Sequence, residues 1–153
     1  MHFSTLTLAS LLSLTPLALA VGSANVENGC DKPIYLWSVD SSVGDQQTIE
    51  PGQSYTEEYH RDQVTGGITL KVTRVENGLY NGSPQTNFAL SLEGGRIWYD
   101  LSDVFGDAFK GEEVIVTPSD EECRTIEWKD GVPPEGSQVR DCQENSNVTL
   151  SLC

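Results

Sequence analysis

The sequence has few basic residues and, after its first twenty residues, no long apolar run. Nine lysines and arginines stand against 23 acidic residues, so the formal net charge is −14. A chain this acidic repels phosphate backbones and anionic lipid, which argues against nucleic acid and bare membrane as partners. No later window approaches the ~18 apolar residues of a membrane span, and no apolar tail follows for a lipid anchor. Neutral glycans, cationic polymers and other proteins remain as partner classes.

Histidine and closely spaced cysteines are also lacking. Only one histidine, His60, follows residue 20, and no serine or cysteine nucleophile motif lies near it. A lone histidine of this kind predicts a surface residue and not a catalytic triad. The four cysteines stand far apart, and none has the two-to-four-residue spacing of a zinc site. We therefore predict neither a metal site nor a cofactor.

The first twenty residues have the pattern of a secretory signal peptide. They contain no Asp, Glu, Lys or Arg, and their apolar segment ends in Ala18-Leu19-Ala20, the small-x-small pattern of a cleavage site. The alternative is a buried N-terminal helix, against which Pro16 argues. We predict that residues 1–20 are a signal peptide, that residues 21–153 form one domain, and that the protein is secreted to the extracellular space or cell wall.

Cys30, Cys123, Cys142 and Cys153 form an even set, which predicts two disulfides in an exported chain. Three pairings are possible. We favour Cys30–Cys153 with Cys123–Cys142, because the last residue of a chain frays unless it is tied down. In the chain-entropy view, the bridge between the two ends contributes ~4–5 kcal/mol and the smaller loop ~3 kcal/mol.

Several short stretches have the alternating pattern of strands, and no window has the period of a helix. The strand-like stretches are Ile34–Trp37, Ile68–Thr73, Phe88–Leu92, Ile97–Leu101, Val114–Val116 and Val148–Leu152. Gly94 and Gly95 predict a hairpin, because two glycines supply the positive φ of a tight turn. Short strands at this spacing predict an all-β sandwich or barrel. Lys129–Asn147 is polar and predicts a long loop held by the smaller disulfide.

Several motifs together resemble thaumatin-like proteins, and most closely the small secreted fungal members called antigenic or yeast-phase-specific proteins. The motifs are ENGCDKPIYLWSV, IEPGQSYTEEY, QTNFALSLEGGRIWYDLSDVFGDAF, PSDEEC, GSQV with the DC that follows it, and the terminal TLSLC. Their order spans most of the chain from Asn28 to Cys153. The resemblance implies a single-domain β-sandwich in which the first cysteine is bridged to the last.

The resemblance carries few functional residues with it. Larger thaumatin-like proteins have a cleft lined by Arg, Glu and three Asp, to which glucan binding or weak glucanase activity is attributed. Asp100 matches one of these carboxylates, but Phe105 and Asn87 stand where two others are expected. One matching position of five does not make an acidic cleft, so we predict no catalytic residue.

The candidate binding residues are Trp98, Asp100 and Asp103. Alternation along the strand places Trp98 and Asp100 on the face opposite Ile97, Tyr99 and Leu101, where they form a sugar-binding pair. Asp100 and Asp103 have two other interpretations, a pair of catalytic carboxylates or acceptors of backbone N–H groups at a strand end. We favour the last. Of the other tryptophans, we expect Trp37 to be structural and Trp128 to be partly exposed.

Two sequons, at Asn147 and Asn81, predict N-glycosylation, the second less efficiently because Pro84 follows Ser83. The function that we predict is that of a monomeric, non-catalytic, extracellular or cell-wall-associated protein that binds β-glucan-type polysaccharide. Two alternatives stay open: a weak endo-β-1,3-glucanase that uses Asp100 with a neighbouring carboxylate, and an antigen or effector that acts by binding a host or other extracellular protein.

Overall fold

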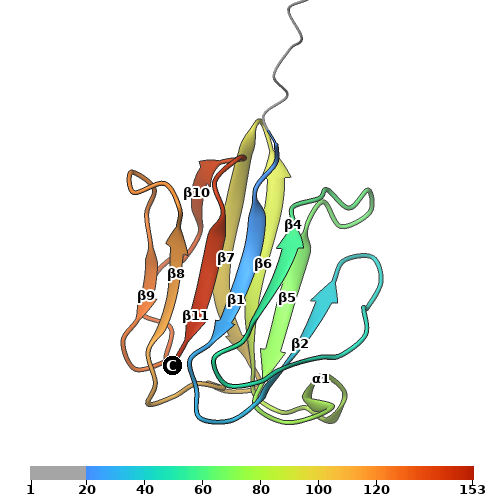
Figure 1. Cartoon of the computed structure of the whole chain (residues 1–153), viewed down its shortest axis with the longest axis vertical. Coiled ribbons are helices and arrows are strands. Elements are labelled where there is room, and N and C mark those ends of the chain that lie inside the picture. The colour runs from blue at the N-terminus through green and yellow to red at the C-terminus, as the bar shows by residue number, and fades with distance from the viewer. Residues whose placement is uncertain (1–19) are drawn as a thin grey trace, which may run out of the picture.

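The computed structural model describes residues 20–153, so the predicted signal peptide lies outside the described residues except for Ala20. Two sheets pack face to face as a sandwich (Figure 1). The elements of residues 20–153 are β1 (Ser23–Asn28), β2 (Ile34–Val39), β3 (Gln47–Ile49), β4 (Ser54–Glu58), β5 (Ile68–Thr73), α1 (Gly78–Asn81), β6 (Gln85–Glu93), β7 (Arg96–Val104), β8 (Val114–Pro118), β9 (Ile126–Trp128), β10 (Arg140–Gln143) and β11 (Val148–Leu152). The all-β sandwich predicted from the sequence is confirmed.

The strand order brings the two ends of the described chain together. One sheet has the order β4-β1-β11-β8-β9 and the other β10-β7-β6-β5-β2-β3. β1 and β11 run parallel, with Asn28 opposite Leu152, and every other pairing is antiparallel. Cys30 lies two residues after β1 and Cys153 directly after β11, so their sulfurs meet and form a disulfide. Cys123 and Cys142 form the other, so the favoured pairing is confirmed.

The core lies between the sheets and follows from the alternation. Ile97, Tyr99 and Leu101 of β7 are at most 1% exposed, as predicted, and face apolar side chains of the other sheet such as Val26 and Leu150. The turn from β6 to β7 has Gly94 and Gly95 at φ 61° and 72°, which confirms the predicted hairpin.

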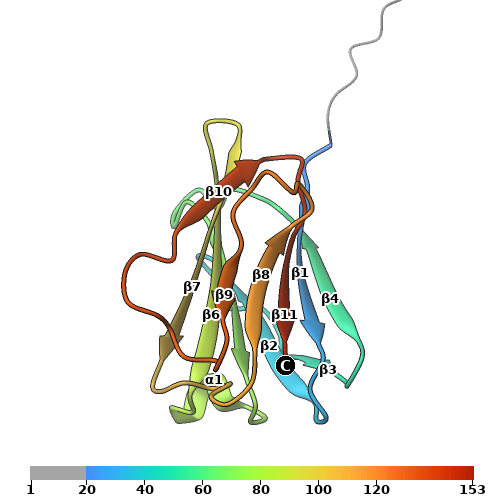
Figure 2. The ribbon, with the colours of Figure 1, turned by 90° about the vertical axis from the view of Figure 1, so that its left-hand side faces the viewer.

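The segment from Lys129 to Asn147 is not a loop throughout. Its residues 140–143 form β10, which pairs with β7 at the edge of the six-stranded sheet. Cys142 has no exposed surface, so its disulfide fixes the strand from the core side. Only residues 129–139 project as a loop between β9 and β10 (Figure 2).

Two tryptophans are buried for different reasons. Trp37 is 1% exposed, which confirms a structural role, but it lies on the outer side of the six-stranded sheet with Tyr80 edge-on 6.2 Å away. The expectation that Trp128 is partly exposed is wrong, because it too is 1% exposed. β9 turns this ring into the sandwich, and its Nε1 donates to Oε1 of Gln138 at 3.2 Å.

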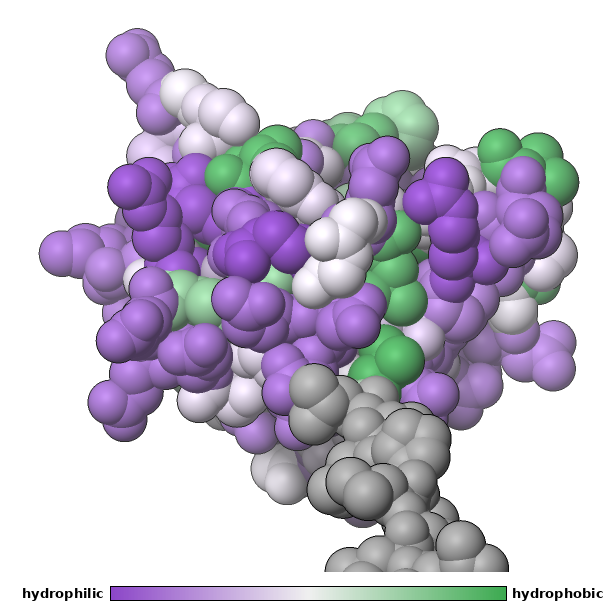
Figure 3. Space-filling view, turned by 90° about the horizontal axis from the view of Figure 1, so that it is seen from above, coloured by the Kyte–Doolittle hydropathy of each residue, from purple (hydrophilic) through white to green (hydrophobic). Residues whose placement is uncertain are grey.

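The face of the molecule that is seen from above is mainly hydrophilic (Figure 3). Seen from above, apolar side chains form several separate groups among polar ones (Figure 3). No helix among the described residues is long and apolar enough to cross a membrane.

Candidate functional site

The outer face of the six-stranded sheet presents the side chains that alternate with the core residues. The register aligns them in rungs that cross the sheet from β7 to β2. One rung consists of Asp100, Ala89, Thr69 and Val39, and the next of Ser102, Asn87, Lys71 and Trp37. Trp98 lies beside Ser91 on a third rung. With strands about 4.8 Å apart, the first rung spans roughly 14 Å.

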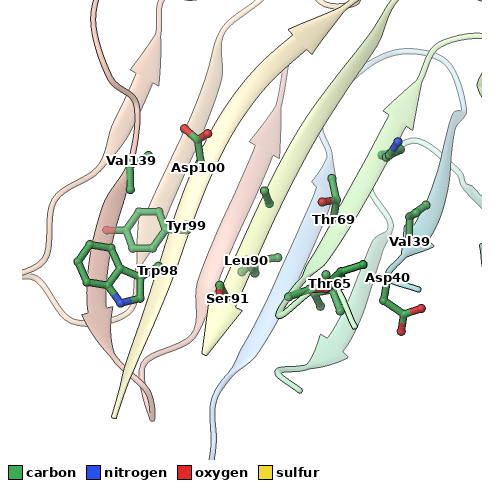
Figure 4. A pocket seen from close by; sticks show the side chains of 14 residues that line it. Val39, Asp40, Thr65, Thr69, Leu90, Ser91, Trp98, Tyr99, Asp100 and Val139 are labelled. Atoms are coloured by element: carbon green, nitrogen blue, oxygen red, sulfur yellow. Dashed lines mark hydrogen bonds between the residues drawn. The ribbon is translucent and has the colours of Figure 1, made fainter. Parts of the chain in front are cut away.

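A groove of about 390 Å³ runs across this face, and we call it the Trp98 groove. Trp98 and Asp100 lie at one end, close to Val139, and Asp40 lies at the other (Figure 4). Trp98 is 40% exposed, whereas Asp100 is half-buried. The predicted outward orientation of these two side chains is confirmed. Their binding of sugar stays a prediction. The floor of the groove, between its two ends, is lined by Thr69, Lys71, Ala89 and Ser91.

One wall of the Trp98 groove is held by aspartates in the loops after β2 and β4. Oδ1 of Asp62 accepts the backbone N–H groups of Val64 at 2.9 Å and Thr65 at 2.6 Å. Oδ2 of Asp62 accepts the hydroxyl of Ser41 at 2.7 Å, which ties the two loops together. These bonds hold the pKa of Asp62 well below its usual range, and the bond from the Thr65 N–H has the largest effect. The hydrogen bonds of Asp62 thus join the two loops of this wall to each other.

Asp40 extends this hydrogen-bonded wall. It accepts the backbone N–H of Ser42 at 2.7 Å, and this bond is the main reason why its pKa is lowered. His60 is exposed, as predicted, with Nε2 3.4 Å from Oδ2 of Asp40 and Nδ1 3.6 Å from Oε1 of Glu57. The sequence reasoning missed this wall, although aspartate two or three residues before Ser or Thr is a known turn signal.

The opposite wall comes from the loop between β9 and β10. Val139 is 46% exposed and lines both the Trp98 groove and a second cavity of about 410 Å³. Asp100 also lines both, so the two hollows adjoin at this pair. The loop is held by Gln138, which accepts from Trp128 and donates to the carbonyl of Gly136 at 3.1 Å.

Asp103 does not belong to this site, which corrects the sequence prediction. β7 continues to Val104, so alternation turns Asp103 to the side of Leu101, opposite to Trp98 and Asp100. Its Oδ1 accepts the hydroxyl of Thr86 at 2.6 Å. Its Oδ2 is buried without a hydrogen-bond partner among the described residues. Burial, and to a lesser extent the charge of Asp107, raises the pKa of Asp103 to about 6.

The other interpretations of the two aspartates also change. Neither Asp100 nor Asp103 accepts a backbone N–H with its side chain in residues 20–153, so the favoured strand-end role is wrong. The alternation along β7 turns the two side chains to opposite faces of the sheet, although both residues line the second cavity. A role of the two as a catalytic pair stays a prediction.

The remaining predicted positions are exposed. Asn147 and Asn81 both lie at the surface, so their glycosylation stays a prediction. Oδ1 of Asn147 accepts the N–H of Ser23 at 2.9 Å, and Oδ1 of Asn81 accepts the N–H of Ser83 at 3.1 Å. Among the described residues, Asp120, Cys123 and Cys142 each place a possible metal-ligand atom within 4.8 Å of the other two. These two sulfurs are joined in a disulfide, so this group lacks the thiolates that a metal needs.

Comparison with known proteins places the chain among fungal sequences. Residues 11–153 match the family described as Blastomyces yeast-phase-specific protein. An antigenic thaumatin-like protein of Arthroderma benhamiae is 30% identical over 168 residues, an alignment that covers 100% of this chain and 84% of the relative. The secreted thaumatin-like protein calA of Emericella nidulans is 26% identical, with 97% and 92% covered.

Two solved structures share the fold. The protein elicitor MoHrip2 from Magnaporthe oryzae superposes with a TM-score of 0.72 and 22% identity, covering 86% of this chain and 98% of that one. The thaumatin-like xylanase inhibitor TLXI superposes with a TM-score of 0.56 and 13% identity, covering 85% and 98%. At these identities the likeness establishes a thaumatin-like fold and nothing further.

Proposed function

This chain belongs to the Blastomyces yeast-phase-specific protein family, and we propose that it is a secreted, non-catalytic protein that binds β-glucan-type polysaccharide outside the cell. The observation that carries the proposal is the Trp98 groove, in which an exposed tryptophan stands beside a carboxylate. Secretion is supported by the signal-peptide pattern and by the name of the Emericella nidulans relative.

The chemistry of the Trp98 groove suits a neutral sugar chain. An indole ring offers a flat apolar face for the C–H groups of a pyranose, and Asp100 beside it accepts hydrogen bonds from hydroxyl groups. The hydroxyls of Thr69 and Ser91 continue along the floor. The groove runs across the strands and is open to solvent, so a polymer can pass through it without a free chain end. A neutral polymer also avoids the repulsion that a net charge of −14 exerts on polyanions.

Sedimentation of the purified protein with insoluble β-1,3-glucan and with chitin tests this function. We expect the wild type to pellet with glucan and Trp98→Ala to lose roughly tenfold or more in affinity, since about 1.4 kcal/mol of stacking corresponds to tenfold. Phe105→Ala is the matched control, because Phe105 is 67% exposed but lies outside the groove. A wild type that stays wholly in the supernatant with both polymers would remove the proposal.

A second candidate function is binding to another protein. It is favoured by large exposed apolar residues at the far end of β7 from Trp98, namely Tyr80 at 69% and Phe105 at 67%. The register Thr73–Gln85–Val104 places the segments that carry them at one end of the sheet. In that case Phe105→Ala, and not Trp98→Ala, weakens binding to a candidate protein partner in a pull-down.

A further inference from the structure

A third cavity, of about 270 Å³, lies along β10 and the segment that carries Cys123. It is lined by three of the five arginines in the chain, Arg96, Arg124 and Arg140, with Glu122 and Asp141 as the carboxylates. In a protein of net charge −14 this gathering leaves one positive charge in excess at a single cavity. We call it the arginine cavity. It is separate from the Trp98 groove, although Val139 lines both.

The three arginines differ in the hydrogen bonds and ion pairs that their guanidinium groups form. Arg96 donates through Nε to Asp141, which neutralises one of the positive charges. Arg140 donates through Nη1 to the carbonyls of Ser137 at 3.0 Å and Val139 at 2.8 Å, which orients its guanidinium. Within residues 20–153 it forms no ion pair. The guanidinium of Arg124 has no hydrogen bond and no ion pair within the described part of the chain.

Tyr99 lies beside the arginine cavity. It donates a hydrogen bond to the carbonyl of Arg124, at the edge of the core. The pKa of Tyr99 is raised to about 12, mainly by burial and also by the charge of Asp141. The charges of Arg140 and Arg96 act in the opposite direction. The three arginines line one cavity, and the hydroxyl of Tyr99 contacts the backbone of one of them.

We propose that the arginine cavity is a binding site for a single carboxylate group, held by Arg124 with the help of Arg140. A guanidinium presents parallel N–H groups that match the two oxygens of a carboxylate. One excess positive charge balances one carboxylate, whereas a doubly charged phosphate would leave a negative excess. Polyanions are disfavoured because the rest of the surface is acidic. A small anion experiences mainly its local surroundings, because the screening length is about 8 Å at physiological ionic strength.

The test is a titration of the ¹⁵N-labelled, disulfide-bonded full chain with acetate, with sodium chloride exchanged to keep the ionic strength constant. We expect saturable shifts of the Nε–Hε signals of Arg124 and Arg140 and none at Arg61, which donates to the carbonyl of Leu92 elsewhere. In Arg124→Gln, the affinity for acetate, read from the Arg140 signal, should fall by about tenfold or more, because a charge-assisted hydrogen bond is lost. The matched control Arg61→Gln removes the same charge from the chain and should leave the titration unchanged.

Three results would overturn the proposal. The first is an absence of saturable shifts in the wild type, and the second is an equal response in Arg124→Gln. The third is phosphate that binds tenfold more tightly than acetate in a parallel titration, which would refute the assignment to a singly charged carboxylate. No glucan enters this experiment, so its result is independent of the function proposed for the Trp98 groove.

Discussion

Replacing Asp103 by asparagine should stabilise the protein at neutral pH. One oxygen of the Asp103 carboxyl is buried without a hydrogen-bond partner among residues 20–153, and the pKa of the group is raised from 3.8 to about 6, mainly by burial. The folded state therefore binds this proton more tightly than the unfolded state does. The contribution of Asp103 to stability is complete below pH ~3.8 and is lost as the pH rises through about 6. Asparagine keeps an oxygen to accept the Thr86 hydroxyl and carries no charge.

The magnitude follows from the shift. About 2 pH units at 1.36 kcal/mol each set a ceiling of ~3 kcal/mol. Because the side chain is only half-buried, solvent screening reduces this to roughly 1–1.5 kcal/mol. We expect Asp103→Asn to be more stable than the wild type by that amount at pH 7 and nearly equal to it at pH 4. For a domain of this size the gain at pH 7 corresponds to a Tm about 3–5 °C higher.

Urea unfolding at several pH values between 4 and 7 measures the difference directly. The control is Asp45→Asn, which removes the same charge from an exposed side chain that has no hydrogen bond among residues 20–153. It corrects for the general relief of repulsion in a chain of net charge −14. The reasoning is refuted if Asp103→Asn is no more stable than Asp45→Asn at pH 7, or if the two variants depend on pH in the same way.

Two further predictions concern the termini and the wall of the Trp98 groove. The double variant Cys30→Ser with Cys153→Ser removes the disulfide that closes a loop whose ends are 123 residues apart. Its free energy of unfolding, measured in urea, should be about 4–5 kcal/mol lower than that of the wild type. A loss below about 1 kcal/mol would contradict this prediction. Asp62→Ala should abolish hydrogen-exchange protection at Val64 and Thr65 while β11 stays protected, and Asp45→Ala should change neither. In the wild type, protection of these two amides should persist at pH ~4, because the stabilisation by Asp62 is present above its unfolded pKa and is lost only as the pH falls through the lowered value in the folded state.

Much of the fold is encoded in local sequence patterns. Alternation of apolar and polar residues identified the strands that became β5, β7 and β11, since the period of two is a property of an extended backbone. The Gly94–Gly95 pair identified the β6–β7 hairpin, because the two positive φ values are a local requirement. The outward pairing of Trp98 and Asp100 followed from the same alternation.

Tertiary structure decided where strands end and which of them pair. The sequence pattern of β7 stops at Leu101, but pairing with β6 as far as Gln85 extends the strand to Val104 and turns Asp103 inward. β10 has no alternating apolar pattern and exists because it pairs with β7 and is bridged at Cys142. The burial of Trp128 depends in the same way on the pairing of β9 with β8.

The sites depend on contacts that span the chain. The Trp98 groove joins loops after β2 and β4 to a loop before β10, and the arginine cavity joins Arg96, Arg124 and Arg140 from three separate segments. Local sequence determined the strands and the facing of their side chains because both depend on neighbouring residues. Only the tertiary structure determined the sites, because strand pairing and loop packing depend on residues distant in sequence.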